Sequence, residues 1–212
     1  VCTLTWFRFL LSFLLLAVYL GVRGKLPTLK QFRATSWKLL ITAIIFLAAN
    51  YILFLKGLAL TSAANAEVII QLAPLLMGMG GLLIFRFGYS WRQWSGVGVL
   101  TVGLVLFFHE KLTSVITIPT NYLLGTGLVA LGAVAWAVYA LAQKQLLGTL
   151  SSMHIMVIIY GVCAFLFLPF ATLKLLFTLN YFHWGTLIFC GLNALIAYGA
   201  FAESCLALGV IT

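Results

Sequence analysis

The stretch LLITAIIFLAANYILFL, from Leu39 to Leu55, is apolar at nearly every position and has no polar face. A soluble helix carries an apolar stripe beside a polar face, whereas a helix that is apolar all round is surrounded by lipid or by other helices. Val97 to Phe108 has the same character. Seven such runs are long enough to cross the hydrocarbon core of a bilayer as helices. The predicted spans lie near residues 2–22, 37–60, 63–85, 93–109, 121–142, 152–173 and 184–207.

The composition also indicates a protein that lies in lipid. Of the 212 residues, 64% are hydrophobic and 7% are charged, so a soluble domain would carry more apolar surface than it can bury. Backbone groups in lipid must bond to one another, which leaves helices or closed barrels. The continuous apolar runs lack the alternation of barrel strands. We therefore predict an all-α, polytopic membrane bundle with seven spans.

The basic residues are distributed unevenly between the connections. The net charge is +9, and most of it follows the first, third and fifth spans: Arg23, Lys25, Lys30, Arg33, Lys38, Arg86, Arg92 and Lys144. The opposite connections carry Lys111 and Lys174. The positive-inside rule places the basic connections in the cytoplasm, against anionic lipid headgroups of the cell membrane, and Val1 on the outer side. The basic stretch lacks a folded nucleic-acid-binding module, so we expect no nucleic-acid partner.

A weak internal repeat relates the second predicted span to the seventh. An offset of 147 residues aligns five identical residues, with Trp37, Leu40, Ile41, Tyr51 and Phe54 matching Trp184, Leu187, Ile188, Tyr198 and Phe201. Under the predicted topology the two spans run in opposite directions. Inverted repeats of this kind are typical of secondary transporters, in which the substrate binds near the membrane midplane between the halves.

Several segments resemble a known family. GLALTSAANAEVIIQLAPLL (Gly57 to Leu76) and RQWSGVGVLTVGLVLFF (Arg92 to Phe108) are similar to the third to fifth helices of EamA-type transporters of the drug/metabolite transporter superfamily. GTGLVALGAVAWAVYALAQK (Gly125 to Lys144) and AYGAFAESCLALG (Ala197 to Gly209) resemble that family's sixth and eighth helices. The resemblance covers nearly the whole chain.

The resemblance implies ten helices in two inverted five-helix repeats. The seven spans would then be helices two to eight. Residues 1–109 would form the first repeat without its first helix, and residues 121–212 the second repeat without its last two helices. We expect the chain, which opens at Val1 and stops at Thr212, to be flanked by further helices.

Charged residues inside spans are costly in lipid and suggest function. Lys56 and Glu67 lie symmetrically about the tight connection Thr61 to Ala64, so an ion pair between them is expected at one depth. The pair would either pin a helical hairpin or form part of an outer gate, with Arg8 as a second cation at that depth. A further alternative for Lys56 is a side chain that extends to the headgroups.

Glu203 is the other embedded acid, near the cytoplasmic end of the last span. It would either bind and release a proton during transport, or pair with a further helix or with the headgroups.

Polar and aromatic residues within the spans are the candidates for a substrate path. Pro74 removes a backbone hydrogen bond and predicts a broken or kinked helix, whose free carbonyl groups can serve a substrate. Trp136 and Tyr139 lie three residues apart on one helix face, where they would stack on a substrate or simply pack. The candidate path residues are Asn50, Gln71, Pro74, Trp136, Tyr139, Asn193 and Tyr198.

Catalytic motifs are missing from the sequence. The four cysteines form no C-x-x-C, and there is no H-E-x-x-H, no G-x-S-x-G and no phosphate-binding Gly-Lys loop. We expect no enzyme activity, metal or cofactor. The predicted function is transport of a small metabolite that is amino-acid-like, nucleoside-like or drug-like, by alternating access and in the export direction. A channel and a non-transporting membrane scaffold or assembly protein are the alternatives, and the oligomeric state is left open.

Overall fold

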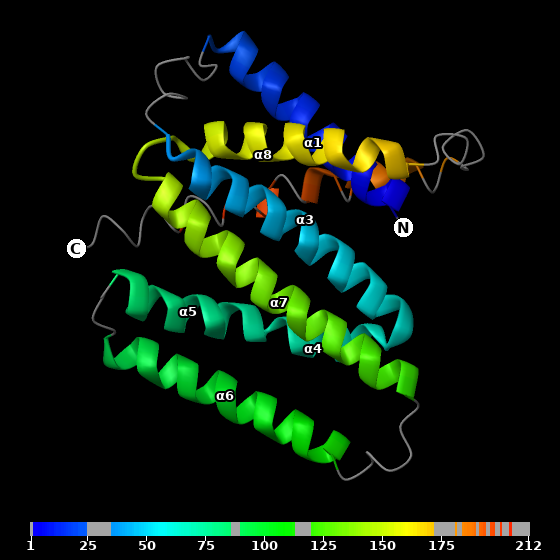
Figure 1. Cartoon of the computed structure of the whole chain (residues 1–212), viewed down its shortest axis with the longest axis vertical. Coiled ribbons are helices and arrows are strands. Elements are labelled where there is room, and N and C mark those ends of the chain that lie inside the picture. Colours follow the sequence, from blue (N-terminus) through cyan, green and yellow to red (C-terminus); the bar gives the residue numbers. More distant parts are fainter. Residues whose placement is uncertain are drawn as a thin grey trace. The chain divides into compact units, whose positions relative to one another are not determined.

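The structure, a computed structural model, describes residues 2–24, 35–85, 90–112, 120–171, 181, 184–189, 191–193, 196, 197, 200 and 204. Every regular element among these residues is a helix, which confirms the predicted all-α class (Figure 1). The elements are α1 (Cys2–Val22), α3 (Trp37–Leu60), α4 (Ala63–Ile70), α5 (Leu72–Phe85), α6 (Trp91–Leu112), α7 (Thr120–Leu146), α8 (Ser152–Phe167) and the 3₁₀ turn η2 (Leu168–Phe170).

The helices follow the predicted spans closely. The predicted spans 2–22 and 37–60 coincide with α1 and α3, and α6, α7 and α8 begin within two residues of their predicted starts. The predicted span 63–85 is divided at Gln71 into α4 and α5. Most of the predicted span 184–207 lies outside the described residues.

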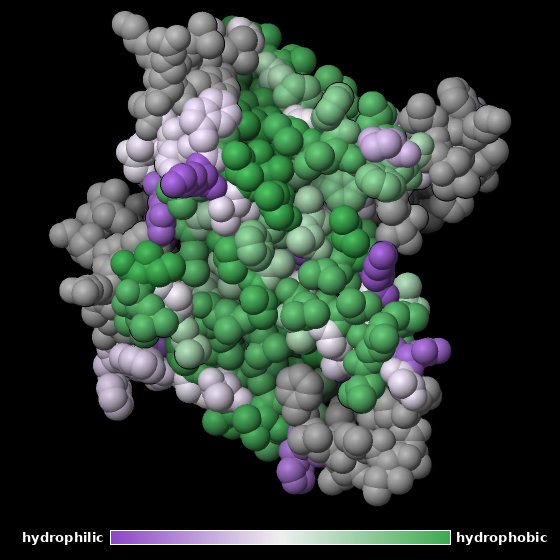
Figure 2. Space-filling view, in the orientation of Figure 1, coloured by the Kyte–Doolittle hydropathy of each residue, from purple (hydrophilic) through white to green (hydrophobic). Residues whose placement is uncertain are grey.

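Within the described residues, five segments are long and apolar enough to cross a membrane, judged by length and composition. Apolar residues accordingly cover much of the visible surface (Figure 2). Helix α6 is not among the five, although it has 22 residues, because Arg92 and Gln93 at its start and His109, Glu110 and Lys111 at its end lower its hydropathy. The segments are Thr5–Val22, Trp37–Leu60, Ala63–Ile84, Thr120–Leu146 and Ser152–Phe170.

Local side-chain chemistry sets several helix boundaries. The Ser62 hydroxyl accepts a hydrogen bond of 3.2 Å from the Asn65 backbone N–H and so caps the start of α4. Ser151 caps α8 in the same way, by accepting from the His154 N–H at 3.4 Å. After α1 the chain turns at Gly24, whose φ of 62° is left-handed and suits glycine. These interactions explain why α4 and α8 begin, and why α1 ends, where they do.

The interruption at Gln71 follows from Pro74. Proline has no N–H to donate to the carbonyl of Ile70 four residues earlier, and its ring collides with that carbonyl in a regular helix. The Gln71 N–H instead donates to the Val68 carbonyl at 3.1 Å, as in a tighter turn. The predicted break of this span is therefore present, one turn before the proline.

The chain forms two compact units. One consists of the described residues of Val1–Ile45 and Ala142–Thr212, and the other of those of Phe46–Leu141. Helices α3 and α7 each contribute residues to both units. The units are defined by packing, so the division of the chain into two sequence repeats stays a prediction.

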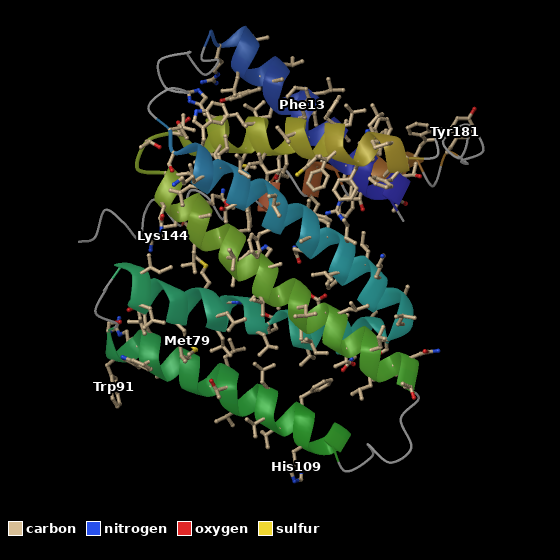
Figure 3. All side chains as sticks on the ribbon, viewed as in Figure 1. Phe13, Met79, Trp91, His109, Lys144 and Tyr181 are labelled. Atoms are coloured by element: carbon tan, nitrogen blue, oxygen red, sulfur yellow. The ribbon has the colours of Figure 1, made fainter. Side chains whose placement is uncertain are left out.

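In the first unit, α1 packs along α8 through aromatic side chains. The Phe9 ring lies 5.9 Å from the Tyr160 ring and 5.8 Å from the Phe167 ring, measured between centroids. Phe13 of α1 is labelled in Figure 3. Its ring lies against Gly161, where a Cβ would come within 2.9 Å of the ring, so a larger residue would force the ring to move. This packing buries the apolar face that α1 turns toward α8.

Helix α1 also contacts the described residues near position 190. The Ser12 hydroxyl is fully buried and donates a hydrogen bond of 3.1 Å to the Gly191 carbonyl. The Phe7 and Trp184 rings meet edge to face at 5.5 Å. These contacts hold the described part of the seventh predicted span against α1 within the first unit.

In the second unit, the core lies where α3, α4 and α7 meet. Its fully buried members are Ala66, Ile69 and Val129, and Phe54, Leu58, Leu72 and Ala130 pack against them. Helix α6 runs beside α5 (Figure 1) and buries little apart from Leu104. Trp91 and His109, near its two ends, point away from α5 (Figure 3).

Candidate functional site

In the second unit, α3 and α7 approach each other closely at two glycines. A Cβ on Gly57 would lie 2.7 Å from the Gly125 carbonyl oxygen and 2.9 Å from the Val129 nitrogen. A Cβ on Gly125 would lie 2.8 Å from the Leu60 Cβ. Real side chains do not tolerate such distances, so both positions require glycine. Small residues at helix contacts of this kind let backbones approach closely in membranes.

Seven residues further along α7, Gly132 lies beside Asn50 of α3. A Cβ on Gly132 would be 3.4 Å from the Phe54 nitrogen and 3.6 Å from both the carbonyl oxygen and the Oδ1 atom of Asn50. Because lower residue numbers on α3 meet higher ones on α7, the two helices are antiparallel here, as Figure 1 also shows. Gly132 therefore places α7 backbone beside the Asn50 amide.

The Asn50 amide is the notable polar group of this contact. The residue is 7% exposed, and its Oδ1 atom is buried with no hydrogen-bond partner. Buried side-chain carbonyl groups in folded proteins nearly always accept a hydrogen bond, since leaving one unmade costs about 1–3 kcal/mol. Asn50 was predicted as a path residue, and the structure shows an acceptor there that the protein itself does not use.

Helical periodicity places Trp136 and Tyr139 on the same face of α7 as Gly132, four and seven residues further on. Tyr139 is 1% exposed, and Trp136 is half-buried. Both rings take part in further polar or ring contacts within the protein. The α3-facing side of α7 thus carries glycine near Asn50 and two aromatic rings beyond it.

A polar cluster ties the α3–α4 connection to α7 at the other end of this contact. The Asn65 Nδ2 group donates to the Thr61 hydroxyl at 2.8 Å and to the Thr126 hydroxyl at 2.9 Å. The Thr126 hydroxyl in turn donates to the Tyr122 carbonyl at 3.0 Å. Asn65 is 3% exposed, so its amide group is held inside the protein by these bonds.

This cluster was not predicted from the sequence. Asn65 and Thr126 are separated by 61 residues, and no local pattern links them. The available signal was the polar Asn65 one turn into an apolar span, together with Ser62 as a potential cap.

Comparison with known proteins gives the class of the molecule. Residues 1–109, slightly more than half of the chain, match the EamA-like transporter family. The chain belongs to this family. Its resemblance to EamA-type transporters is thereby confirmed.

Relatives of this EamA-like chain cover nearly all of it. It is 35% identical over 203 residues to the uncharacterized inner membrane transporter YhbE of Escherichia coli K12. The aligned residues make up 95% of this chain and 63% of the relative. It is 32% identical over 205 residues to an uncharacterized transporter of Haemophilus influenzae strain Rd, covering 95% of this chain and 65% of the relative. The chain thus spans less than two thirds of the length of these relatives.

A solved structure supports the fold. A crystal structure of a protein with 18% sequence identity superposes on the EamA-like chain with a TM-score of 0.71, covering 96% of this chain and 69% of the other. Together with the apolar helices, the family and its relatives show that the chain is a multi-pass membrane protein.

The predicted ion pair is not formed in this structure of the EamA-like chain. Lys56 on α3 and Glu67 on α4 are both exposed, and neither has an ion-pair partner among the described residues. Arg8 lies in the first unit, half-buried on α1, with its Nε atom buried. The role of these three residues as an outer gate stays a prediction.

The remaining predicted residues are distributed along the surface or lie outside the described part of the chain. Gln71, Pro74 and Asn193 are exposed. Tyr198 and Glu203 lie outside the described residues. The structure therefore brings Asn50 into contact with the α7 face that carries Trp136 and Tyr139, and does not add the other candidates to that contact.

Metal-binding clusters are not found in the described ranges: no group of three or more His, Cys, Asp or Glu side chains lies together there. Cys163 is a free, fully buried thiol on α8.

Proposed function

We propose that the chain is part of a secondary transporter that moves a small polar metabolite across the cell membrane. Family membership and the relative named as an inner membrane transporter support transport and this location. The uneven distribution of Lys and Arg supports an orientation with the basic connections in the cytoplasm and Val1 outside.

The observation that carries the proposal is the Asn50 Oδ1 atom, buried beside Gly132 without a hydrogen-bond partner. In a transporter, such an acceptor is satisfied by a donor on the substrate while the substrate is bound. Gly132 has no side chain, so no side-chain atom at this position of α7 lies against the Asn50 amide. We assign Asn50 to the substrate path on this ground.

The aromatic rings on the same face of α7 complete the proposed path. Trp136 and Tyr139 provide flat, polarizable surfaces for a planar or cationic group of the substrate. The other path candidates lie outside the contact between Asn50 and α7. We assign them to other parts of the path: Gln71, Pro74, Asn193 and Tyr198.

Transport by alternating access and in the export direction is part of the proposal. The aromatic repeat between the second and seventh predicted spans supports two inverted halves that rock against each other. Arg8, Lys56 and Glu67 form the outer gate in this scheme, and Glu203 couples a proton to the cycle.

The test is uptake into proteoliposomes by the full-length protein. Amino acids, nucleosides and cationic dyes are offered with and without a pH gradient. We expect saturable uptake of one class, which Asn50→Leu reduces about tenfold, the effect of losing one buried hydrogen bond. Because Oδ1 makes no bond in the protein, the melting temperature of Asn50→Leu is expected to be unchanged or higher.

Asn121→Leu is the matched control, since Asn121 is exposed at the start of α7. Flux without saturation or counter-transport would identify a channel. The complete absence of flux, with stable binding of a partner protein, would identify a scaffold instead.

A further inference from the structure

Helix α7 carries a second buried amide, Gln143, one turn before its C-terminal end. Its side chain is 0% exposed, and neither Oε1 nor Nε2 has a hydrogen-bond partner. Only its backbone is used, because the Gln143 carbonyl accepts from the Leu147 N–H at 3.1 Å.

Structural explanations of this glutamine are weak. A side chain with no exposed area does not reach lipid headgroups, so it does not lie at the bilayer interface as long polar side chains often do. The neighbouring Ala140 and Leu146 are also fully buried, at 0% and 1% exposure. A leucine or methionine would fill the same volume without leaving a donor and an acceptor unsatisfied.

We infer that Gln143 is a substrate-recognition residue whose amide pairs with an amide-type edge on the transported molecule. The inference rests on the proposed transport function and names the chemical class of its substrate. That class is a carboxamide, lactam or imide, in which an N–H and a C=O group lie side by side.

The donor and acceptor capacity of glutamine leads to this class. Nε2 only donates and Oε1 only accepts. An ammonium group would satisfy Oε1 alone, and a carboxylate would satisfy Nε2 alone. A planar amide edge satisfies both at once with two parallel hydrogen bonds, and buried bonds of this kind discriminate strongly against molecules that lack one of the groups. A sugar diol is the competing class, because each hydroxyl both donates and accepts.

The test uses the full-length protein with nicotinamide and uridine as amide-edge probes, nicotinate as the matched carboxylate, and ribose as the diol. Binding is measured from the rise in melting temperature with probe concentration, and uptake is measured in proteoliposomes. We expect the amide-edge probes to bind in preference to nicotinate and ribose. Gln143→Leu and Gln143→Met are each expected to weaken that binding about tenfold or more.

The unliganded variants separate recognition from packing. Gln143→Leu is expected to melt at the same temperature as the natural protein or higher, because it removes two unsatisfied groups. Gln145→Leu, at a half-buried position two residues further on, is the control and is expected to keep the binding.

Unchanged probe binding by Gln143→Leu would overturn the inference, as would a lower melting temperature with binding intact. Preference for ribose or nicotinate, or no response to nicotinamide and uridine, would overturn the amide-edge class. Uptake of another class in that case would leave the proposed transport function standing, whereas the absence of uptake of any compound would count against that function itself.

Discussion

Gly57 of α3 and Gly125 of α7 face each other with their backbones in contact, so that a Cβ on Gly57 would lie 2.7 Å from the Gly125 carbonyl oxygen. Lipid provides no hydrophobic drive for helices to associate, and close packing takes its place. The approach of α3 to α7 in the second unit therefore depends on the absence of two side chains.

Gly125→Ala is expected to lower the free energy of unfolding by about 1–3 kcal/mol, because the added methyl group collides with the backbone and side chain of Leu60. Thermal unfolding in detergent measures the change. Gly127→Ala is the control, since nothing lies within 4 Å of a Cβ at that position. Equal stability of the two variants would show that the helices do not approach this closely.

Asn65→Ala and Thr126→Val are each expected to lower the free energy of unfolding by about 1 kcal/mol, since each removes one partner of a partly buried hydrogen bond. The double variant is expected to lose less than the sum of the single losses, because both changes remove the same bond. Strict additivity of the two losses would contradict the Asn65–Thr126 contact.

Thr101→Val provides a matched control for the threonine change. The Thr101 hydroxyl donates at 2.8 Å to the Val97 carbonyl of its own helix on an exposed face of α6. Its replacement is expected to leave stability nearly unchanged.

Lys56→Ala and Glu67→Ala are expected to have additive effects on stability. Both side chains are exposed and have no ion-pair partner in this structure, so neither variant leaves a buried charge without its partner. Chemical unfolding of the two single variants and the double variant measures the coupling. Strong coupling in transport assays, with additive stability, would identify a pair that forms in another state of the cycle and would support the gate.

Single cysteines at Ser36 and Tyr181 are expected to react from opposite sides of the membrane. Ser36 precedes Trp37 and Tyr181 precedes Trp184, the first aligned residues of the two related spans, and both positions are exposed. An impermeant maleimide applied to intact cells, in a background without the four natural cysteines, should label position 181 and spare position 36. Labelling of both from the outside would refute the inverted arrangement.

The helices of the described chain could be predicted because the surrounding lipid requires helical structure. Lipid offers no hydrogen bonds, so each apolar run must form a helix, and its ends follow from the nearest polar or charged residues. The division of the span 63–85 was foreseen from Pro74, because the loss of one N–H acts locally.

Contacts between helices were foreseen less well. Gly57 and Gly125 look like many other glycines in a chain that has 19 of them, and only the approach of α3 to α7 distinguishes them. Gln143 follows the predicted span 121–142 directly and was not singled out, although it is fully buried. Asn50 was singled out because an amide in the middle of an apolar run is conspicuous from the sequence itself, and its role in a substrate path stays a prediction.

The interruption at Gln71 makes the α4–α5 segment mechanically soft. Ile70 has already lost the donor that a regular helix would supply, so bending the segment there breaks no additional α-helical bond to that carbonyl. A continuous helix such as α7 must break backbone hydrogen bonds to bend by the same angle. Conformational strain in the second unit will therefore collect at this one joint, while the longer helices move as rigid rods.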